Sequence, residues 1–401
     1  MTYLVQLVLA MLVWCAADPV SAGDAIRVLL DQQVKKVTVQ ADRGLILTLA
    51  NGERRSSARP VTVSVAAGQL VLNGMRFHSS AAVFHARNGD LSALITAHLG
   101  QTPGSDPGRA TKKAIEPSQS FRVGGSLQIM LRNGALLVIN ELEMEEYVKG
   151  VVPSEMSAGW HLEALKVQAV ATRTYALYQR LANAGREFDV VAGTQDQVYR
   201  GRVGVDERVQ QAVEATRGLV ITYENAPILA AFSSTAAGPT EDAMNVWSKD
   251  LPYLKGVDCP FDENSPYYQW RVEVPIQSLE QSLRKQGVPV GTIATVTPFL
   301  YSRAGRVDKI RILHSDGELV LRGQDFRKAV GYSVIPSTQF EIETLGRLVV
   351  FAGRGSGHAV GLCQWGAKEL ADQGYPYDAI LRYYFPGTDL QQTGVLHLSS
   401  R

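Results

Sequence analysis

One stretch, residues 135–176, constrains the possible fold of this chain more than any other part of the sequence. Residues 135–139 form a short apolar run typical of a strand, and a short acidic amphipathic segment follows it. A long alanine-rich helix is expected to begin near His161. Pro153 is expected to end the first helix, because proline lacks the amide hydrogen that a helix interior uses. The sequence therefore predicts a strand followed by two helices, with Glu155 in the turn between the helices.

Glu155 is the most informative residue of this stretch. Its neighbours include Pro153, Met156 and Trp160, so its carboxyl group is expected in apolar surroundings. Burial disfavours the charged form of a carboxyl group and raises its pKa, which is the property that a general acid requires. The alternative is an ordinary solvated residue of the turn, and the local sequence leaves both interpretations open.

The N-terminus has the pattern of a secretory signal peptide, predicted as residues 1–22. Residues 3–17 form an apolar run that is short for a membrane span, and Val-Ser-Ala at 20–22 predicts cleavage after Ala22. No Lys or Arg precedes the apolar run, so an uncleaved N-terminal anchor is the alternative. We therefore expect an exported protein, either periplasmic or extracellular.

Composition excludes some classes of function. The chain has 401 residues, of which 45% are hydrophobic, enough for more than one packed core. Its formal net charge of +1 indicates no nucleic-acid partner. Beyond the signal peptide only Cys259 and Cys363 remain, with no Cys-x-x-Cys motif. In an oxidising compartment these two cysteines either pair or stay free, and the sequence does not decide between these states.

The pattern along the chain predicts a mixed α+β protein. Residues 23–100 contain short alternating runs separated by Asn-Gly turns, typical of a small β-rich module. Residues 101–120 have a linker composition, residues 121–390 mix strands and helices, and residues 391–401 form a C-terminal tail. Further elements are expected as helices at 207–217 and 275–286, strands at 293–296, 307–313 and 318–321, and a hairpin over 219–232.

Two further features are candidates for a binding site. Arg173 falls within the apolar stripe of the long helix, so its head either reaches an acid or a polar ligand or extends to solvent. The Gly-rich segment 353–361 lacks the Lys-Ser/Thr ending of a phosphate-binding loop, so no nucleotide is expected. It instead predicts close backbone approach around His358, with Gln364 and Trp365 at the start of the next helix. Trp365 either stacks on a sugar or belongs to the core.

Other enzyme classes lack their motifs. The sequence contains neither a His-x-x-x-His pair for zinc nor the Gly-x-Ser-x-Gly motif of many serine hydrolases. The residues alone therefore indicate an exported mixed α/β protein with a candidate buried glutamate.

Several separated motifs resemble, in their order, the SpoIID family (stage II sporulation protein D) and its relative, the amidase enhancer LytB. They are residues 140–147, Gly-Val-Val-Pro-Ser-Glu-Met at 150–156, residues 163–175, Gln-Val-Tyr-Arg-Gly at 197–201, residues 240–247 with 252–254, residues 355–367 and Tyr-Tyr-Phe-Pro-Gly at 383–387. The resemblance covers roughly residues 121–388 and implies a SpoIID-like domain behind the β-rich module.

The resemblance implies a lytic transglycosylase that cleaves peptide-free peptidoglycan glycan strands, with Glu155 as general acid and then base. The product would carry 1,6-anhydro-N-acetylmuramic acid ends. One alternative is a non-catalytic glycan-binding enhancer of an N-acetylmuramoyl-L-alanine amidase. Another is a hydrolytic muramidase, which would need a second carboxylate such as Asp258 or Asp262. Implied partners are cell-wall glycan strands and an amidase, and the implied roles are cell-wall remodelling and sporulation.

The resemblance also implies which residues line the substrate cleft: Arg173, Tyr199, Thr240, His358, Gln364 and Trp365. Some sporulation members carry Cys and His before the Gln-Val-Tyr motif and bind zinc there. Residues 190–196 contain neither, so no metal and no cofactor are expected. The family's Ser-Gly-Gly-x-Thr motif is Ala-Ala-Gly-Pro-Thr here, at 236–240, which leaves substrate preference or activity open to difference.

Overall fold

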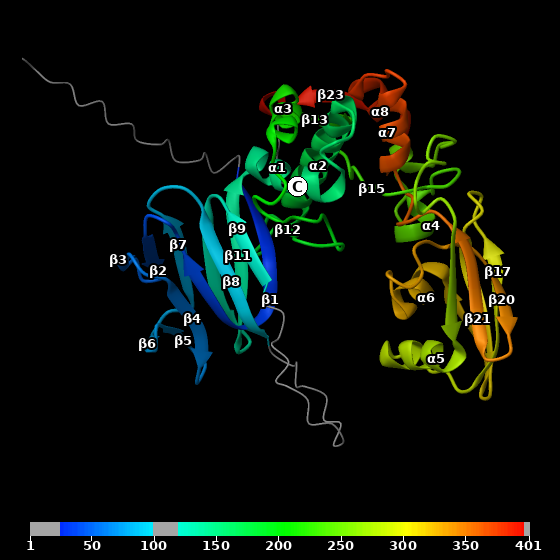
Figure 1. Cartoon of the computed structure of the whole chain (residues 1–401), viewed down its shortest axis with the longest axis horizontal. Coiled ribbons are helices and arrows are strands. Elements are labelled where there is room, and N and C mark those ends of the chain that lie inside the picture. Colours follow the sequence, from blue (N-terminus) through cyan, green and yellow to red (C-terminus); the bar gives the residue numbers. More distant parts are fainter. Residues whose placement is uncertain (1–24, 99–118, 397–401) are drawn as a thin grey trace, which may run out of the picture.

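The computed structural model describes residues 25–98 and 119–396 (Figure 1). The predicted signal peptide at 1–22, nearly all of the predicted linker and the end of the predicted tail lie outside the described residues. Within the described ranges, no helix combines the length and the apolar character needed to cross a bilayer. The described chain is a mixed α+β protein, which confirms the predicted fold class.

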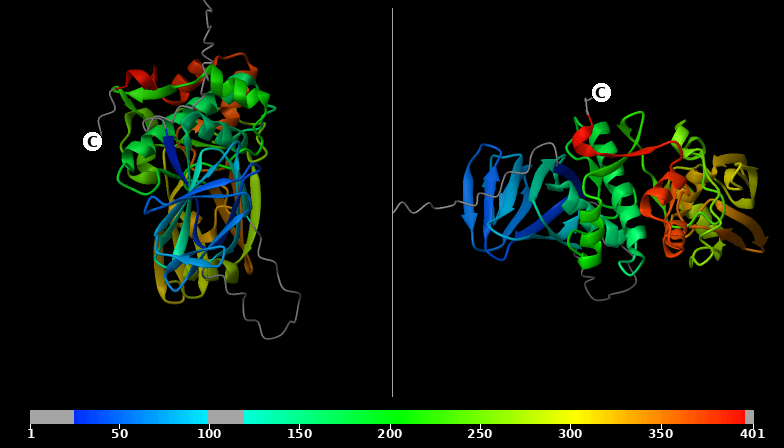
Figure 2. Two further views of the ribbon diagram at one scale, coloured as in Figure 1. Left: turned by 90° about the vertical axis from the view of Figure 1, so that its left-hand side faces the viewer. Right: turned by 90° about the horizontal axis from the view of Figure 1, so that it is seen from above.

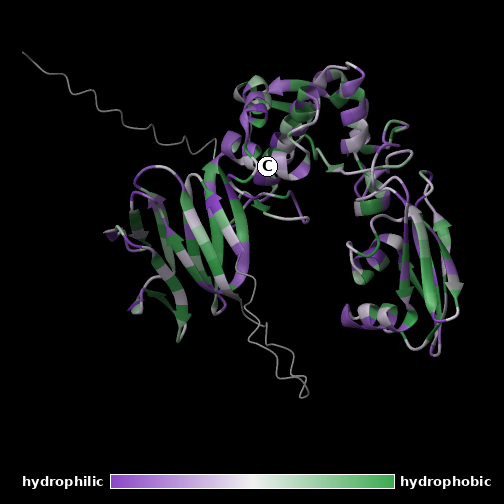
Figure 3. Ribbon diagram, in the orientation of Figure 1, coloured by the Kyte–Doolittle hydropathy of each residue, from purple (hydrophilic) through white to green (hydrophobic). Residues whose placement is uncertain are grey.

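A curled, mainly antiparallel sheet of 12 strands forms one end of the molecule. Its main path runs β3-β2-β7-β10-β11-β1-β4-β5-β6, and β8, β9 and β12 join off this path. Alternate residues of the strands are buried, and Figure 3 shows apolar residues at intervals along most of these strands. The strands are β1 (Ala25–Gln40), β2 (Leu45–Leu49), β3 (Arg54–Ser57), β4 (Val61–Ala66), β5 (Gln69–Leu72), β6 (Met75–Phe77), β7 (Ala81–Ala86), β8 (Leu91–His98), β9 (Gln119–Val123), β10 (Ser126–Arg132), β11 (Ala135–Glu143) and β12 (Val190–Val191).

The large sheet crosses the predicted boundary between the β-rich module and the following domain. β10 pairs with β7, and β11 pairs with β1, so two strands from beyond residue 120 lie between strands from before residue 100. Alternation along a sequence identifies strands but not their partners, because pairing is a long-range choice. The boundary predicted at residues 101–120 therefore does not divide the sheet, whose strands come from both sides of it.

A helical layer follows the sheet (Figure 2). The helix α2 (Leu162–Ala182) lies at its centre and packs against α1 (Met144–Glu155), α3 (Glu207–Ala215), α7 (Gln364–Asp372) and α8 (Tyr377–Tyr384). Helices that are apolar on most sides are buried, as α2 is here. The strands β13 (Leu219–Tyr223), β14 (Ala226–Pro227) and β23 (Asp389–Gln392) pair beside this layer.

Pro153 does not end the first helix as predicted. It lies inside α1, and Glu155 is the last residue of that helix rather than part of a turn. Pro153 has no amide hydrogen to donate to the Lys149 carbonyl, and the helix continues past it for two residues without that one bond. The Met156 amide still donates to the Val152 carbonyl at 2.9 Å, and the Ser154 hydroxyl donates to the Gly150 carbonyl at 3.2 Å.

A second hydrophobic core lies at the opposite end of the molecule from the large sheet (Figure 1, Figure 2). It contains two three-stranded sheets and two helices, and Leu279, Phe326 and Phe351 are among its buried residues. Its elements are β16 (Trp270–Pro275), α5 (Ile276–Lys285), β17 (Ile293–Tyr301), β18 (Val307–His314), β19 (Gly317–Arg322), α6 (Gly323–Val330), β20 (Gln339–Leu345) and β21 (Leu348–Arg354). The predicted helix and strands of this region are confirmed, but the sequence did not reveal that they form a separate core.

Short elements connect the second core to the helical layer. They are β15 (Phe232–Ser233), α4 (Ala243–Trp247), η1 (Pro252–Leu254) and β22 (Leu362–Cys363), and a final 3-10 turn, η2 (Thr393–Val395), follows β23. The hairpin predicted over 219–232 forms only at its tip, where residues 222–223 pair with 226–227. The strand β15 instead pairs in parallel with β22, which brings the chain back toward the helices.

Candidate active site

Glu155 lies where three parts of the chain meet. Its Oε1 accepts a hydrogen bond from the Val198 amide at 2.8 Å, and its Oε2 accepts one from Nε2 of Gln364 at 3.4 Å. Nε2 of Gln364 also donates to Oε1 of the buried Gln168 of α2, at 3.3 Å. The end of α1, the segment 197–201 and the start of α7 thus converge on one carboxylate.

The surroundings of Glu155 shift its pKa in the direction predicted. Burial disfavours the charged form and raises the pKa of Glu155, while the hydrogen bonds from Val198 and Gln364 offset part of this effect. Both of these hydrogen-bond donors are uncharged, so neither favours the carboxylate as strongly as an Arg or Lys partner would. The result is a carboxyl group that holds its proton to higher pH than a free glutamate does.

Close backbone packing brings the Val198 amide to Glu155. A Cβ at Gly150 of α1 would lie 2.5 Å from the Tyr199 ring and 2.7 Å from the Gly201 carbonyl oxygen, so only glycine fits at Gly150. Gly201 itself has a positive φ of 64°. Tyr199 is anchored by its hydroxyl, which donates to Asn140 Oδ1 at 2.8 Å. These contacts hold the segment 197–201 against α1.

Backbone pairing positions the other side of the site. β22 runs parallel to β15, and the Trp365 amide donates to the Ser234 carbonyl at 3.1 Å. Gln364 therefore begins α7 in a defined place. Trp365 and Trp160 form an edge-to-face pair with ring centroids 5.1 Å apart, and both rings are partly exposed. Partly exposed aromatic rings are suited to contact an apolar face of a ligand.

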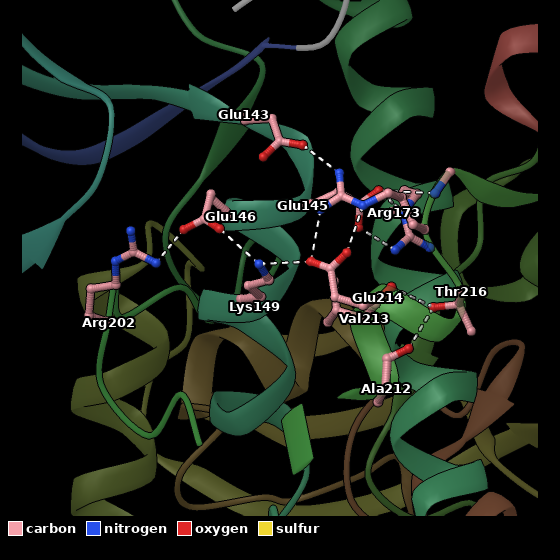
Figure 4. Close-up of polar contacts among 12 residues, drawn as sticks. Glu143, Glu145, Glu146, Lys149, Arg173, Arg202, Ala212, Val213, Glu214 and Thr216 are labelled. Carbon is pink, nitrogen blue, oxygen red and sulfur yellow. Dashed lines mark hydrogen bonds and ion pairs between the residues drawn. The ribbon is translucent and has the colours of Figure 1, made fainter. Parts of the chain in front are cut away.

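Arg173 is not brought to Glu155. It forms a buried, two-pronged ion pair with Glu145, with Nε 2.8 Å from Oε1 and Nη2 2.5 Å from Oε2 (Figure 4). Its Nη1 donates to the Leu219 carbonyl at 3.0 Å. The expectation that its head reaches an acid is confirmed, but the acid belongs to α1. Arg173 joins α2 to α1, and its buried position differs from the expected place in a substrate cleft.

Tyr199, Thr240 and His358 also make their hydrogen bonds within the protein. Tyr199 is buried and stacks on Tyr147. Thr240 is buried, and its hydroxyl and amide both donate to the Val257 carbonyl. The partly buried His358 packs on Trp247 with ring centroids 4.9 Å apart, and its Nδ1 accepts the Val360 amide at 3.0 Å. Among the predicted cleft residues, Gln364 is thus the one that hydrogen-bonds to Glu155, and Trp365 is its neighbour in sequence.

His358 is held in its neutral form. Burial, together with the neighbouring positive charges of Arg327 and Arg306, lowers the pKa of His358 to about 3. A neutral imidazole whose Nδ1 accepts a backbone amide shapes the Gly-rich loop rather than supplying a proton.

Two contributors to the site were missed from the sequence. Gln168 is fully buried. It lies three residues after Leu165 and four before Thr172, so it belongs to the same stripe of the helix that indicated Arg173. The Val198 amide belongs to the recognised Gln-Val-Tyr motif, but a backbone donor leaves no side-chain signal. Of the two acids considered for hydrolysis, Asp258 is exposed, and Asp262 is buried with its Oδ2 accepting the Ala237 amide at 2.8 Å.

Comparison with known proteins places the chain in a family. The family model described as "Stage II sporulation protein" matches residues 132–223, which include Glu155 and the segment 197–201. Stage II sporulation protein D of Bacillus subtilis is 31% identical over 298 residues, covering 71% of this chain and 84% of that protein. The chain belongs to the SpoIID family.

Other SpoIID relatives and a second family model extend this finding. An uncharacterized protein of Brachyspira hyodysenteriae is 38% identical over 267 residues, 66% of this chain and 71% of that protein. The amidase enhancer of Bacillus subtilis is 29% identical over 292 residues, 61% of this chain but 40% of that protein. A domain of unknown function matches residues 242–361, a range that contains the whole second core.

Proposed function

We propose that this SpoIID-family chain is a peptidoglycan lytic transglycosylase that acts on glycan strands without stem peptides. The observation that carries the proposal is the state of Glu155: a partly buried carboxyl group with a raised pKa and two uncharged donors. Such a group is suited to give up a proton to a leaving oxygen and then take one back.

The reaction would use this one carboxyl group twice. Glu155 first protonates the glycosidic oxygen that leaves C1 of N-acetylmuramic acid, and the bond between that carbon and oxygen breaks. The resulting carboxylate then accepts the proton of the same sugar's C6 hydroxyl, whose oxygen bonds to C1. The products are a free hydroxyl on the departing sugar and a 1,6-anhydro ring. No water enters, so no second carboxylate is required, in contrast to most hydrolytic glycosidases.

The neighbouring groups have supporting roles in this proposal. The Val198 amide and the Gln364 side chain orient the carboxyl group through neutral hydrogen bonds. The pair of Trp160 and Trp365 would stack on a sugar ring of the glycan. An exported, cell-wall-associated location agrees with this substrate.

Product analysis tests the proposal. Purified protein beginning at Gly23 is incubated with peptide-free glycan strands, and the products are analysed by mass spectrometry. We expect anhydro-muramyl ends, and we expect Glu155→Gln to lower their rate of formation by about 10²–10⁴-fold. The matched control is Glu207→Gln, which alters an exposed glutamate of α3. Reducing ends would instead indicate hydrolysis, and wild-type rates in Glu155→Gln would exclude Glu155 as the acid.

The similarity to an amidase enhancer favours one alternative: a non-catalytic, glycan-binding enhancer of an N-acetylmuramoyl-L-alanine amidase. The altered Ala-Ala-Gly-Pro-Thr segment at 236–240 is compatible with this role. The same glycan preparation distinguishes the two functions. Glycan binding and amidase stimulation without any strand cleavage would support the enhancer and exclude the transglycosylase.

A further inference from the structure

A group of metal-ligating side chains lies beside the candidate active site. Cys259, Asp262 and Cys363 are buried, and their sulfur atoms and a carboxylate oxygen all lie within 4.8 Å of one another. Both cysteines are free. Two of the three residues come from the loop after η1, whereas Cys363 is the residue before Gln364. The cluster therefore connects the loop after η1 to the start of α7, about a hundred residues further along the chain.

Backbone amides surround the cluster as they surround metal-bound thiolates. Cys363 Sγ accepts the amides of Ala236 at 3.3 Å and Gly366 at 3.4 Å. Asp262 Oδ2 accepts the Ala237 amide at 2.8 Å and lies 3.2 Å from Cys363 Sγ. Asp262 Oδ1 is buried and has no hydrogen-bond partner among the described residues. Outer hydrogen bonds that orient ligands, together with an unused ligand atom, are features of a built metal site.

The backbone of α7 approaches Cys259 closely at Gly366. A Cβ at Gly366 would lie 2.7 Å from Cys259 Sγ and 2.1 Å from the Tyr384 hydroxyl oxygen, so a side chain at that position would displace the cluster. The Tyr384 hydroxyl lies 3.2 Å from Cys259 Sγ. The glycine of the Gln-Trp-Gly sequence therefore has a packing role that belongs to this cluster.

We propose that Cys259, Asp262 and Cys363 bind one Zn²⁺ ion, with one coordination position left for water beside the Tyr384 hydroxyl. Two thiolates and a carboxylate form a ligand set that Zn²⁺ accepts. Tetrahedral zinc, with bonds of roughly 2.3 Å to sulfur and 2.0–2.2 Å to oxygen, places such ligand atoms about 3.5 Å apart. The observed 3.2 Å between Cys363 Sγ and Asp262 Oδ2 is close to this separation.

Two thiolates and a carboxylate around Zn²⁺ carry one net negative charge. The fully buried Arg306 lies near both this cluster and the buried Glu241, so its positive charge acts on both. Its Nη2 donates to the Ala236 carbonyl at 2.5 Å, in the loop whose amides bind the cluster. A disulfide would use the two sulfur atoms only and would leave the buried Asp262 carboxylate with the Ala237 amide as its hydrogen-bond donor. Zinc engages all three side chains.

The ion would position the candidate active site rather than take part in its chemistry. Cys363 caps α7, and the next residue, Gln364, donates to Glu155. Ala236 and Ala237 belong to the loop in which the sequence departs from the family motif. A metal bound here would thus hold both segments. The site differs from the one considered at residues 190–196, and the expectation of no metal is replaced by this proposal.

Metal content tests the proposal. The full-length chain is produced in zinc-supplemented medium and purified without chelators, and zinc per chain is measured by mass spectrometry of the elements. We expect about one zinc ion per chain in the wild type and little in Cys259→Ser, Asp262→Asn or Cys363→Ser. The control Asp258→Asn removes an exposed acid next to Cys259 and should retain the zinc. Replacing zinc by Co²⁺ in the wild type should produce thiolate-to-cobalt absorption, a readout that does not depend on any variant.

Several outcomes would overturn the proposal. An intact mass two hydrogens below the reduced sequence, with thiols that resist alkylation in denaturant, would show a disulfide instead. Zinc retained in all three ligand variants would place the metal elsewhere. Thermal unfolding of each variant separates loss of the ion from loss of the fold. Zinc content is independent of strand cleavage, so this result and that of the glycan assay can fail separately.

Discussion

Two glutamates of α1, Glu145 and Glu155, have hydrogen-bond partners of different charge. Glu145 faces the guanidinium of Arg173 and also accepts the Gly218 amide at 3.1 Å, so its charge is matched. Among residues 25–98 and 119–396, Glu155 at the other end of the same helix accepts hydrogen bonds only from the uncharged Val198 amide and Gln364 side chain. Glu145 is therefore paired with an opposite charge, whereas burial raises the pKa of Glu155.

The raised pKa of Glu155 predicts a pH-dependent cost to folding. Between the free-glutamate pKa, about 4.3, and the raised value, the folded protein holds a proton that the unfolded chain has released. Stability from this group is therefore present at low pH and lost as pH rises through that range. Glu155→Gln lacks this titration, so its melting temperature should rise relative to wild type as pH increases from about 4 to about 7. A constant difference across this range would contradict the prediction, and Glu207→Gln is the control.

The Arg173–Glu145 pair predicts a large stability effect without a direct effect on catalysis. Arg173→Met leaves the Glu145 charge buried and unpaired, which should cost about 3–5 kcal/mol in the free energy of unfolding. The double variant with Glu145→Met as well should recover most of this loss. Urea denaturation measures all three proteins. If the double variant is as unstable as the single one, the unpaired charge is not the cause.

At the scale of elements, the site depends on how closely α1 approaches the segment 197–201. The helix presents Gly150 to the Tyr199 ring, and the Val198 amide beside that ring reaches Glu155, five residues further along α1. Both contacts need a bare backbone at Gly150. The recognised motifs around 151–155 and 197–201 are therefore two sides of one packing contact.

Gly150→Ala tests this contact through the sign of its effect. In an exposed helix, replacing glycine by alanine stabilises by about 1 kcal/mol. Here the new methyl group would overlap the Tyr199 ring, so we expect a loss of about 1–3 kcal/mol, measured by urea denaturation. Gly185→Ala, at a position with no neighbouring atom within 4 Å, should be close to neutral. A stabilised Gly150→Ala protein would show that the segment moves aside freely.

Most helices and strands were predictable because their patterns are local. The helix predicted at 207–217 forms as α3, Glu207–Ala215, and the Asp206 side chain caps it by accepting the Val209 amide, a contact between neighbouring residues. The end of α1 and the partner of β15 were predicted wrongly. The first depends on tertiary support for a proline-containing turn, and the second on a strand more than a hundred residues away.

For the whole molecule, the large sheet makes the N-terminal and central parts of the chain interdependent. β10 and β11 separate β7 from β1, so the earlier strands lack two of their neighbours without residues 126–143. The second core, in contrast, has its own buried residues between 270 and 354. The two hydrophobic cores of the fold therefore do not coincide with the segments predicted from the composition of the chain.

Residues 25–98 expressed alone should not form a cooperative fold. The fragment would expose the edges of β1 and β7 that β11 and β10 cover in the full chain, and unpaired apolar strand edges associate. Circular dichroism with thermal unfolding, compared with residues 25–396, measures the effect. A monomeric fragment with a sigmoidal transition would contradict the interdependence and would restore the boundary predicted at residues 101–120.

The amino-acid sequence by itself determined the α+β class, most of the local elements, the family and Glu155 as the candidate residue for the site. These follow from short-range periodicity, capping and contiguous motifs. Tertiary structure alone decided the strand partners, the second core, and the separation of Arg173 and Tyr199, which stabilise packing, from Gln364, which reaches Glu155. It also brought Cys259 and Asp262 to Cys363. The physical reason is that pairing, burial and ligand geometry depend on residues far apart in the chain, whose meeting no local pattern records.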